Sequence, residues 1–243
     1  MNTKIFEDNI LSRNDIAVRY VFQKMFSPQG TLVAVECLSR FDNLSISPEV
    51  FFRHATAAVR ERIFLEQLAL IEKHKAWFLR NHISATINVD DHILNLLQRI
   101  APISLLPSPL IGLCQPGGPS LGRPVQDLLH NSLAAWQSPQ DTSLWLDDFG
   151  SGYAGINAIR GYHFDYVKID KDFFWHLMRK ESGRQLMDAL VTFLSRNHHN
   201  VIIEGVESEA HKEWLQGMEW FAIQGHYWRE VSIEQLVADD IAM

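Results

Sequence analysis

Residues 143–152 read Ser-Leu-Trp-Leu-Asp-Asp-Phe-Gly-Ser-Gly, and residues 165–170 read Asp-Tyr-Val-Lys-Ile-Asp. In each segment a short apolar run ends in charged residues. Such runs, bounded by glycine and polar residues, are typical of strands buried on both faces, as in a parallel sheet. The carboxyl ends of these strands are where α/β folds place their chemistry. We therefore expect Asp147 and Asp148 to lie at a functional edge of the sheet.

Two carboxylates at the tip of a buried strand repel each other unless a proton or a cation lies between them. A hard divalent cation, which prefers oxygen ligands, would relieve this repulsion. Adjacent aspartates also occur in solvated turns and at helix N-caps. The pair by itself leaves both interpretations open.

The composition is that of an ordinary globular protein: 243 residues, 47% hydrophobic and 21% charged. The net charge of −7 argues against binding a nucleic-acid polymer, which needs clusters of Lys and Arg. Cys37 and Cys114 form no metal or redox motif, so we expect core residues in a reducing compartment. The N-terminus lacks the apolar run of a signal peptide, and no stretch approaches about 18 apolar residues. We expect a cytoplasmic protein without a membrane partner.

Hydrophobic periodicity predicts strands that alternate with helices in one domain, residues 1–243, with residues 1–16 as a lead-in. The first two strands form an antiparallel hairpin around the turn signal at residues 27–30. The expected strands span residues 17–25, 31–38, 84–89, 105–114, 144–148, 165–169, 200–207 and 220–223. The expected helices span residues 48–59, 61–81, 92–100, 125–136, 153–160, 171–197, 209–218 and 233–242.

Polar residues fall at the successive ends of these strands. A barrel brings all such ends to one face, whereas an open sheet spreads them along an edge. Convergence on one site therefore favours a (β/α)8 barrel. The residues concerned are Glu36, Asn88, Asp147, Asp148, Lys168, Glu204 and Gln224.

These residues lie in spaced motifs that resemble the EAL-domain family of cyclic-di-GMP phosphodiesterases, over roughly residues 17–240. Residues 36–38 read Glu-Cys-Leu where the family has Glu-Ala-Leu, and residues 147–153 read Asp-Asp-Phe-Gly-Ser-Gly-Tyr. The segments 167–170, 204–207 and 224–225 follow in the family's order. The chain is most similar to short stand-alone enterobacterial members. The resemblance implies a modified, TIM-like (β/α)8 barrel with an antiparallel first strand, in agreement with the hairpin.

The resemblance also implies metal-dependent hydrolysis of cyclic-di-GMP to linear pGpG, which lowers a second messenger of motility, biofilm and fimbrial regulation. It implies a pair of Mg²⁺ or Mn²⁺ ions, whose oxygen-rich ligands suit these metals. It further implies cyclic-di-GMP as the ligand, with a homodimer or a regulatory protein as partners. The implied metal ligands are Glu36, Asn88, Asp147, Asp148 and Glu204. The implied catalytic residues are Lys168, Glu204 and Asp148. Arg40, Leu38 and Gln224 would bind substrate, and Glu207 would order the loop after the aspartate strand.

One stretch departs from the family pattern. Gly112 and Gln115 stand where the family has a Glu-x-x-Glu motif. A glycine offers no side-chain ligand. Loss of a residue that only supports a metal ligand already costs roughly 10–100-fold in metal affinity or activity, so a missing ligand should cost at least that. Residues 104–124 also contain five prolines, which are unusual in a central strand.

Three explanations of this stretch stay open. The domain could be a degenerate module that binds a protein or a nucleotide without turnover. Another residue or a water molecule could complete the site. Two compensating frameshifts could have altered the sequence. Hydrolysis is the main hypothesis, because both aspartates, Lys168, Glu204 and Arg40 are all present.

Overall fold

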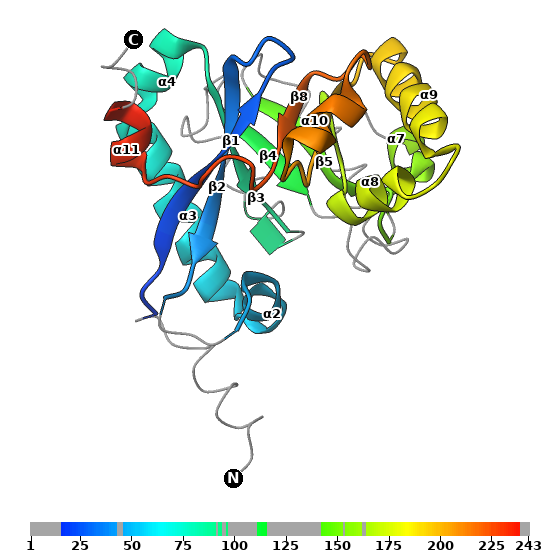
Figure 1. The fold of residues 1–243 in the computed structure, drawn as a ribbon. Coiled ribbons are helices and arrows are strands. Elements are labelled where there is room, and N and C mark those ends of the chain that lie inside the picture. Colours follow the sequence, from blue (N-terminus) through cyan, green and yellow to red (C-terminus); the bar gives the residue numbers. More distant parts are fainter. Residues whose placement is uncertain are drawn as a thin grey trace.

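The computed structural model describes residues 16–42, 46–90, 92–93, 96, 111–115, 142–152, 154–161 and 164–238. Within these residues eight strands close into a barrel in chain order (Figure 1). The strands are β1 Arg19–Phe26, β2 Leu32–Arg40, β3 Ser84–Asn88, β4 Ile111–Gln115, β5 Thr142–Phe149, β6 Tyr166–Ile169, β7 Asn200–Ile203 and β8 Ala222–Gln224. The predicted barrel is confirmed.

The first strand is the exception in direction. β1 pairs antiparallel with both β2 and β8, whereas all other neighbours pair parallel. A tight turn causes the reversal: Ser27 N donates to Thr31 O at 2.9 Å and Gly30 N to Ser27 O at 2.9 Å. Gly30 has a φ of +79°, which glycine adopts without steric cost. The predicted hairpin and the antiparallel first strand are thus confirmed.

The first helices differ from the prediction. Instead of helices over 48–59 and 61–81, the chain forms α2 Pro48–His54, α3 Ala57–Lys73 and α4 Lys75–Asn81. The Thr56 side chain accepts a hydrogen bond from Val59 N, so it caps a new helix where one was expected to continue. The chain turns again at His74, whose Nδ1 lies 3.0 Å from Leu70 O. Side-chain capping thus accounts for the first boundary, whereas His74 makes no capping hydrogen bond to the helix that follows it.

The later helices are α7 Ile156–Gly161, α8 Lys171–Met178, α9 Gly183–Arg196, α10 Glu209–Leu215 and α11 Ile233–Ala238. The expected single helix over 171–197 is thus two. The break lies where the chain returns on α8: a Cβ at Gly183 would lie 1.8 Å from Leu177 O, so only glycine fits there. The helix expected over 125–136 lies outside the described residues.

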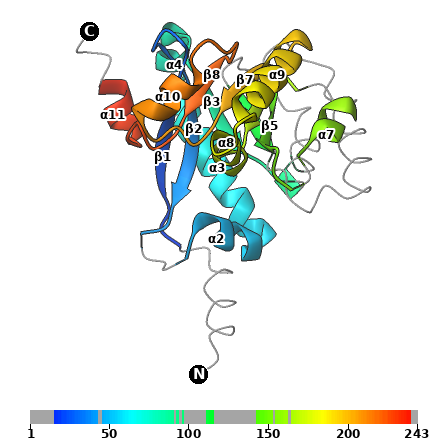
Figure 2. The same ribbon diagram turned by 45° about the vertical axis from the view of Figure 1, so that its right-hand side comes forward.

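The last described helix lies beside the first strand of the barrel. α11 packs against β1, and the red and blue ribbons adjoin in both views (Figures 1 and 2). Phe22 N donates to Val231 O at 2.8 Å and Val231 N to Phe22 O at 3.1 Å, which joins the segment before α11 to β1. None of the helices among the described residues is both long and apolar enough to cross a membrane.

The interior of the barrel is polar toward the carboxyl ends of the parallel strands and apolar toward their amino ends. One buried cluster joins Met25, Ala34, Trp145, Ile202 and Ala222, which come from five different strands. Side chains two positions apart share one face of a strand. The next position on that face, toward the carboxyl ends of the parallel strands, is polar in each case. These positions are Gln23, Glu36, Asp147, Glu204 and Gln224.

Candidate active site

Lys168 lies at the centre of the polar end of the barrel. Its Nζ is 2.9 Å from Glu36 Oε2, 3.0 Å from Asp147 Oδ1 and 2.7 Å from Glu204 Oε1. The Lys168 side chain is only 1% exposed. One ammonium therefore faces three carboxylates, two on β2 and β5 and one directly after β7. When all are ionised, the group carries an excess of negative charge that a divalent cation could balance.

Glu36 is the most completely bonded of these carboxylates. Besides Lys168, it accepts hydrogen bonds from Asn88 Nδ2 at 2.9 Å and from Gln224 Nε2 at 2.6 Å. Burial alone would raise the pKa of Glu36, but the Lys168 ammonium and the two amides outweigh it and lower the pKa. Glu36 is therefore ionised and fixed in place.

Asp147 and Glu204 have the opposite shift. Burial raises the pKa of Glu204 to about 6, and the neighbouring carboxylates add to the rise while Lys168 opposes it. Burial also raises the pKa of Asp147 well above its ordinary value, against the effect of Lys168 and together with that of Glu204. A carboxylate whose charge is disfavoured by burial and by like charges regains it when a cation binds. Electrostatics at these two residues thus favour an added cation.

A local distortion brings Asp147 and Asp148 to the same place. Consecutive side chains of a regular strand point to opposite faces. Here the register with β6 shifts between Leu146 and Phe149, and Asp148 has a left-handed φ of +56°. Oxygens of Asp147, Asp148 and Glu204 consequently lie within 4.8 Å of one another. This all-oxygen group could hold Mg²⁺ or Mn²⁺.

Sequence reasoning missed Gln23. Gln224 Nε2 lies 2.6 Å from Gln23 Oε1 as well as 2.6 Å from Glu36 Oε2, so both amide hydrogens are used. Gln224 Oε1 is left buried, without a hydrogen-bond partner among the described residues. An unpaired buried carbonyl fits a site that takes a cation or a water molecule. The available signal was a polar residue on the inward face of β1, between Val21 and Met25.

The site opens toward solvent on one side. Asn88 is exposed, and the Glu204 side chain is 19% exposed. The buried residues Glu36, Lys168 and Gln224 form the floor. A ligand would therefore approach from the side of Asn88, Asp148 and Glu204.

The register of β4 locates the departure from the family pattern. Gly112 pairs with Thr86 and with Ser143, whereas Cys114 pairs with Asn88 and with Trp145. Gly112 is therefore one layer deeper than Asn88, and Cys114 is level with it. The side chains of residues 111–115 are outside the part of the chain that the structure describes.

The remaining predicted residues lie around this centre. Arg40 and Leu38 continue the inward face of β2 beyond Glu36; Leu38 is half-buried and pairs with Val21. Arg40 binds Glu230, a residue that the sequence did not single out. Glu207 Oε1 lies 3.1 Å from His226 Nδ1, so its described side-chain contact is with the loop after β8. Ordering of the loop after β5 by Glu207 stays a prediction.

Comparisons with known proteins show what this chain is similar to in sequence. Cyclic di-GMP phosphodiesterase PdeH of Escherichia coli (strain K12) is 28% identical over 227 residues, 86% of this chain and 81% of PdeH. Anti-FlhC(2)FlhD(4) factor YdiV of Salmonella choleraesuis (strain SC-B67) is 27% identical over 182 residues, 72% of this chain and 73% of YdiV.

Solved structures share the fold. The crystal structure of the EAL-like domain protein YdiV has a TM-score of 0.77 at 21% identity and covers 91% of this chain and 95% of that one. An EAL domain protein from Listeria monocytogenes EGD-e also has a TM-score of 0.77, at 18% identity, covering 100% and 99%. The family described as EAL domain matches residues 7–230. The chain therefore belongs to the EAL domain family.

Proposed function

We propose that the protein hydrolyses one phosphodiester bond of cyclic-di-GMP to give linear pGpG. The observation that carries the proposal is the group of Asp147, Asp148 and Glu204 oxygens within 4.8 Å, beside a buried lysine. The similarity to PdeH, whose name states this activity, supports the choice of substrate. The product would lower the concentration of a second messenger, with consequences for motility, biofilm and fimbriae.

We assign the metal ligands to Glu36, Asn88, Asp147, Asp148 and Glu204. Their donor atoms are carboxylate and amide oxygens, which fits Mg²⁺ or Mn²⁺ better than softer metals. A pair of such ions would supply Lewis-acid activation of the phosphate and a water of lowered pKa.

The chain's own residues position and neutralise charge. Lys168 holds Glu36, Asp147 and Glu204 in one arrangement and would stabilise negative charge as it develops. Asn88 and Gln224 fix the Glu36 carboxylate by donating to its two oxygens. Arg40, farther along the inward face of β2, would bind a phosphate of the nucleotide. Leu38 would pack against a base.

The test is direct. Purified protein is incubated with cyclic-di-GMP and either Mg²⁺ or Mn²⁺, and pGpG is measured by chromatography. We expect product with metal, and none above background with EDTA or in a Glu36→Ala variant. Wild-type protein that forms no more pGpG than Glu36→Ala would reject hydrolysis.

A second function is favoured by a specific observation. Gly112 offers no ligand, and the chain is 27% identical to YdiV, whose name describes a factor directed against another protein. The alternative is a module that binds a regulatory protein, or the nucleotide, without turnover. Recovery of a partner by pull-down, together with no binding of Mn²⁺ or cyclic-di-GMP by calorimetry, would favour the protein-binding form. Nucleotide binding without pGpG would favour the other.

We further propose a cytoplasmic protein that works as a homodimer, as the resemblance implies. Light scattering of the purified chain measures its oligomeric state, and a monomeric mass at micromolar concentration would contradict the dimer.

A further inference from the structure

Arg40 is already occupied by an anion of the chain itself. Its Nε donates to Glu230 Oε2 at 3.2 Å, and its Nη2 donates to Glu230 Oε1. Its Nη1 donates to Ser39 O at 3.1 Å. The two parallel bonds to Glu230 use the planar fork with which arginine grips a phosphate. An incoming phosphate would therefore have to displace Glu230.

The Arg40–Glu230 pair lies farther along β2 than Glu36, which belongs to the carboxylate group around Lys168. Arg40 and Glu36 are four residues apart on β2, so their Cα atoms are about 13 Å apart. A ligand that reaches both must have the span of a dinucleotide rather than of a single phosphate. The side chains of Arg40 and Glu230 are 28% and 23% exposed, so water screens the ion pair only in part.

The backbone holds Glu230 near Arg40. The paired hydrogen bonds between Phe22 and Val231 fix the residue after Glu230 against β1. Only the Glu230 side chain then needs to move for the pair to open. The chain does not have to unfold this segment.

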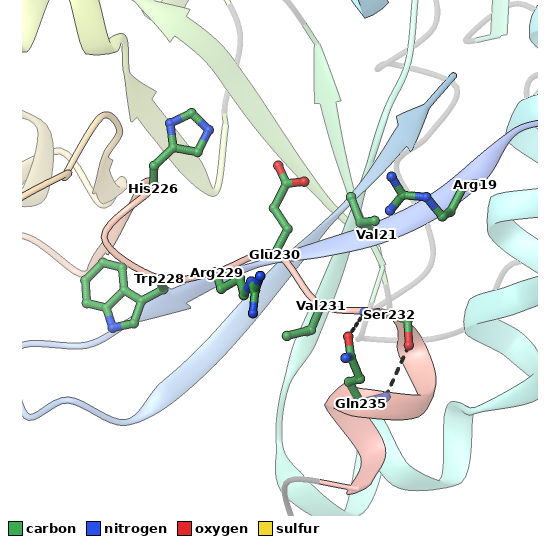
Figure 3. Close-up of a pocket in the computed structure, with 9 residues that line it drawn as sticks. All are labelled: Arg19, Val21, His226, Trp228, Arg229, Glu230, Val231, Ser232 and Gln235. Carbon is green, nitrogen blue, oxygen red and sulfur yellow. Dashed lines mark hydrogen bonds between the residues drawn. The ribbon is translucent and has the colours of Figure 1, made fainter. Parts of the chain in front are cut away.

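A neighbouring cavity gives the side chain somewhere to go. Glu230 lines a cavity of about 420 Å³ together with Arg19 and Arg229 (Figure 3). Figure 3 shows the Glu230 side chain pointing away from Arg229 of its own loop, with Arg19 of β1 on one side of its carboxylate and His226 on the other. Arg19 is held by Asp42, with Nε–Oδ2 and Nη2–Oδ1 distances of 2.9 and 2.8 Å. A displaced carboxylate would thus remain near positive charge.

We propose that Glu230 competes with the nucleotide's phosphate for Arg40 and so sets how tightly the protein binds its ligand. The inference rests on the proposed function in taking cyclic-di-GMP as that ligand. When a site must open before it binds, the apparent affinity falls by the fraction that is open. For a half-buried, doubly hydrogen-bonded pair, we expect a weakening of about 5–30-fold.

The first test does not need the nucleotide. Phenylglyoxal modifies accessible guanidinium groups, and mass spectrometry of the peptide measures the rate at Arg40. We expect Glu230→Gln to raise this rate about 5–30-fold, and added pyrophosphate to suppress it more strongly than in wild type. Asp42→Asn is the matched control: it should speed modification of Arg19 and leave Arg40 unchanged. Equal Arg40 rates in wild type and Glu230→Gln would overturn the proposal.

The second test measures affinity. Calorimetry with cyclic-di-GMP in Ca²⁺ should show about 5–30-fold tighter binding by Glu230→Gln, and Arg40→Ala should abolish the gain in the double variant. Glu230→Asp, whose shorter side chain cannot keep both bonds, should tighten binding in the same direction and serves if Glu230→Gln misfolds. Unchanged or weaker binding by both variants would refute the competition. If no variant binds the nucleotide but Arg40 labelling rises as expected, the proposed function is wrong and Glu230 still masks Arg40.

Discussion

Replacement of Lys168 by methionine tests the electrostatics of the site most sharply. Methionine keeps most of the side-chain volume but removes the charge that faces Glu36, Asp147 and Glu204 at 2.7–3.0 Å. Removing one partner of a buried ion pair costs about 3–5 kcal/mol, because the other charge stays buried and unpaired. The Lys168 side chain is 1% exposed, so solvent screening offsets little of this. At about 2–4 °C per kcal/mol for a chain of this size, the metal-free variant should melt about 6–20 °C below wild type.

The same variant distinguishes a cation site from a structural ion pair. If the carboxylates hold divalent cations, Mn²⁺ should replace part of the missing charge and raise the Tm of Lys168→Met more than that of wild type. At a metal concentration 100 times its Kd, binding adds about 2.7 kcal/mol of stability. The assay is thermal unfolding followed by circular dichroism, in EDTA and in Mn²⁺. Lys212→Met, which breaks the exposed pair with Glu209, is the control and should melt like wild type.

Two outcomes would refute this reasoning. One is a Tm of Lys168→Met in EDTA within about 2 °C of wild type, since that is below the range expected for a buried pair. The other is a Mn²⁺-induced rise that is larger in wild type than in the variant. The first would mean that the carboxylates are protonated or solvated, and the second that Lys168 helps cation binding rather than standing in for it.

Other substitutions and pH test the remaining contacts. Asp148→Val should destabilise the protein by about 1–2 kcal/mol more than Asp148→Asn in urea unfolding, because asparagine tolerates the φ of +56° far better; equal losses would remove the argument for a strained turn. A Cβ at Gly225 would lie 2.1 Å from Val206 O, so Gly225→Ala should cost about 3 kcal/mol or more, whereas Gly155→Ala, with no atom within 4 Å, should stay within about 0.5 kcal/mol. Gln23→Leu should weaken Mn²⁺ binding by roughly 10–100-fold in calorimetry, and Lys24→Leu on the other face of β1 should not; equal affinities would show that Gln23 does not orient Gln224. The pKa of Glu204 is raised to about 6 from 4.5, so its contribution to the stability of the metal-free protein is present below about pH 4.5 and is lost as pH rises through about 6. Mn²⁺ should bind more tightly above pH 6, where Glu204 is ionised. Titrations with Mn²⁺ at pH 5 and 7.5 that give the same affinity would contradict this.

Strands were easier to predict than the ends of helices. An apolar run such as Leu144–Leu146 is buried in any sheet, so local pattern indicates it. At the break between α2 and α3, Val59 N donates to the Thr56 side chain, a bond that competes with continued helix. Small differences in free energy decide such competition, and the hydrophobic periodicity of the sequence does not reveal them.

The candidate site was predicted in its members but not in its contacts. The side chains of Glu36, Asn88, Asp147, Lys168, Glu204 and Gln224 meet as the strand ends suggested. Gln23 and Glu230 went unnoticed because each acts through a partner far away in the chain. Gln23 meets Gln224 across 201 positions, and Glu230 meets Arg40 across 190. Only the closure of the barrel makes these residues neighbours.

The order of apolar runs and of polar residues at their ends was enough to indicate an eight-stranded barrel with carboxylates at its mouth, because these patterns follow from the alternation of each strand. The tertiary structure decided what those carboxylates experience. It buried Lys168 among them, turned Asp148 toward Asp147, and paired Arg40 with an internal anion. Burial, register and charge pairing depend on segments distant in sequence, so they are properties of the folded chain rather than of any one segment.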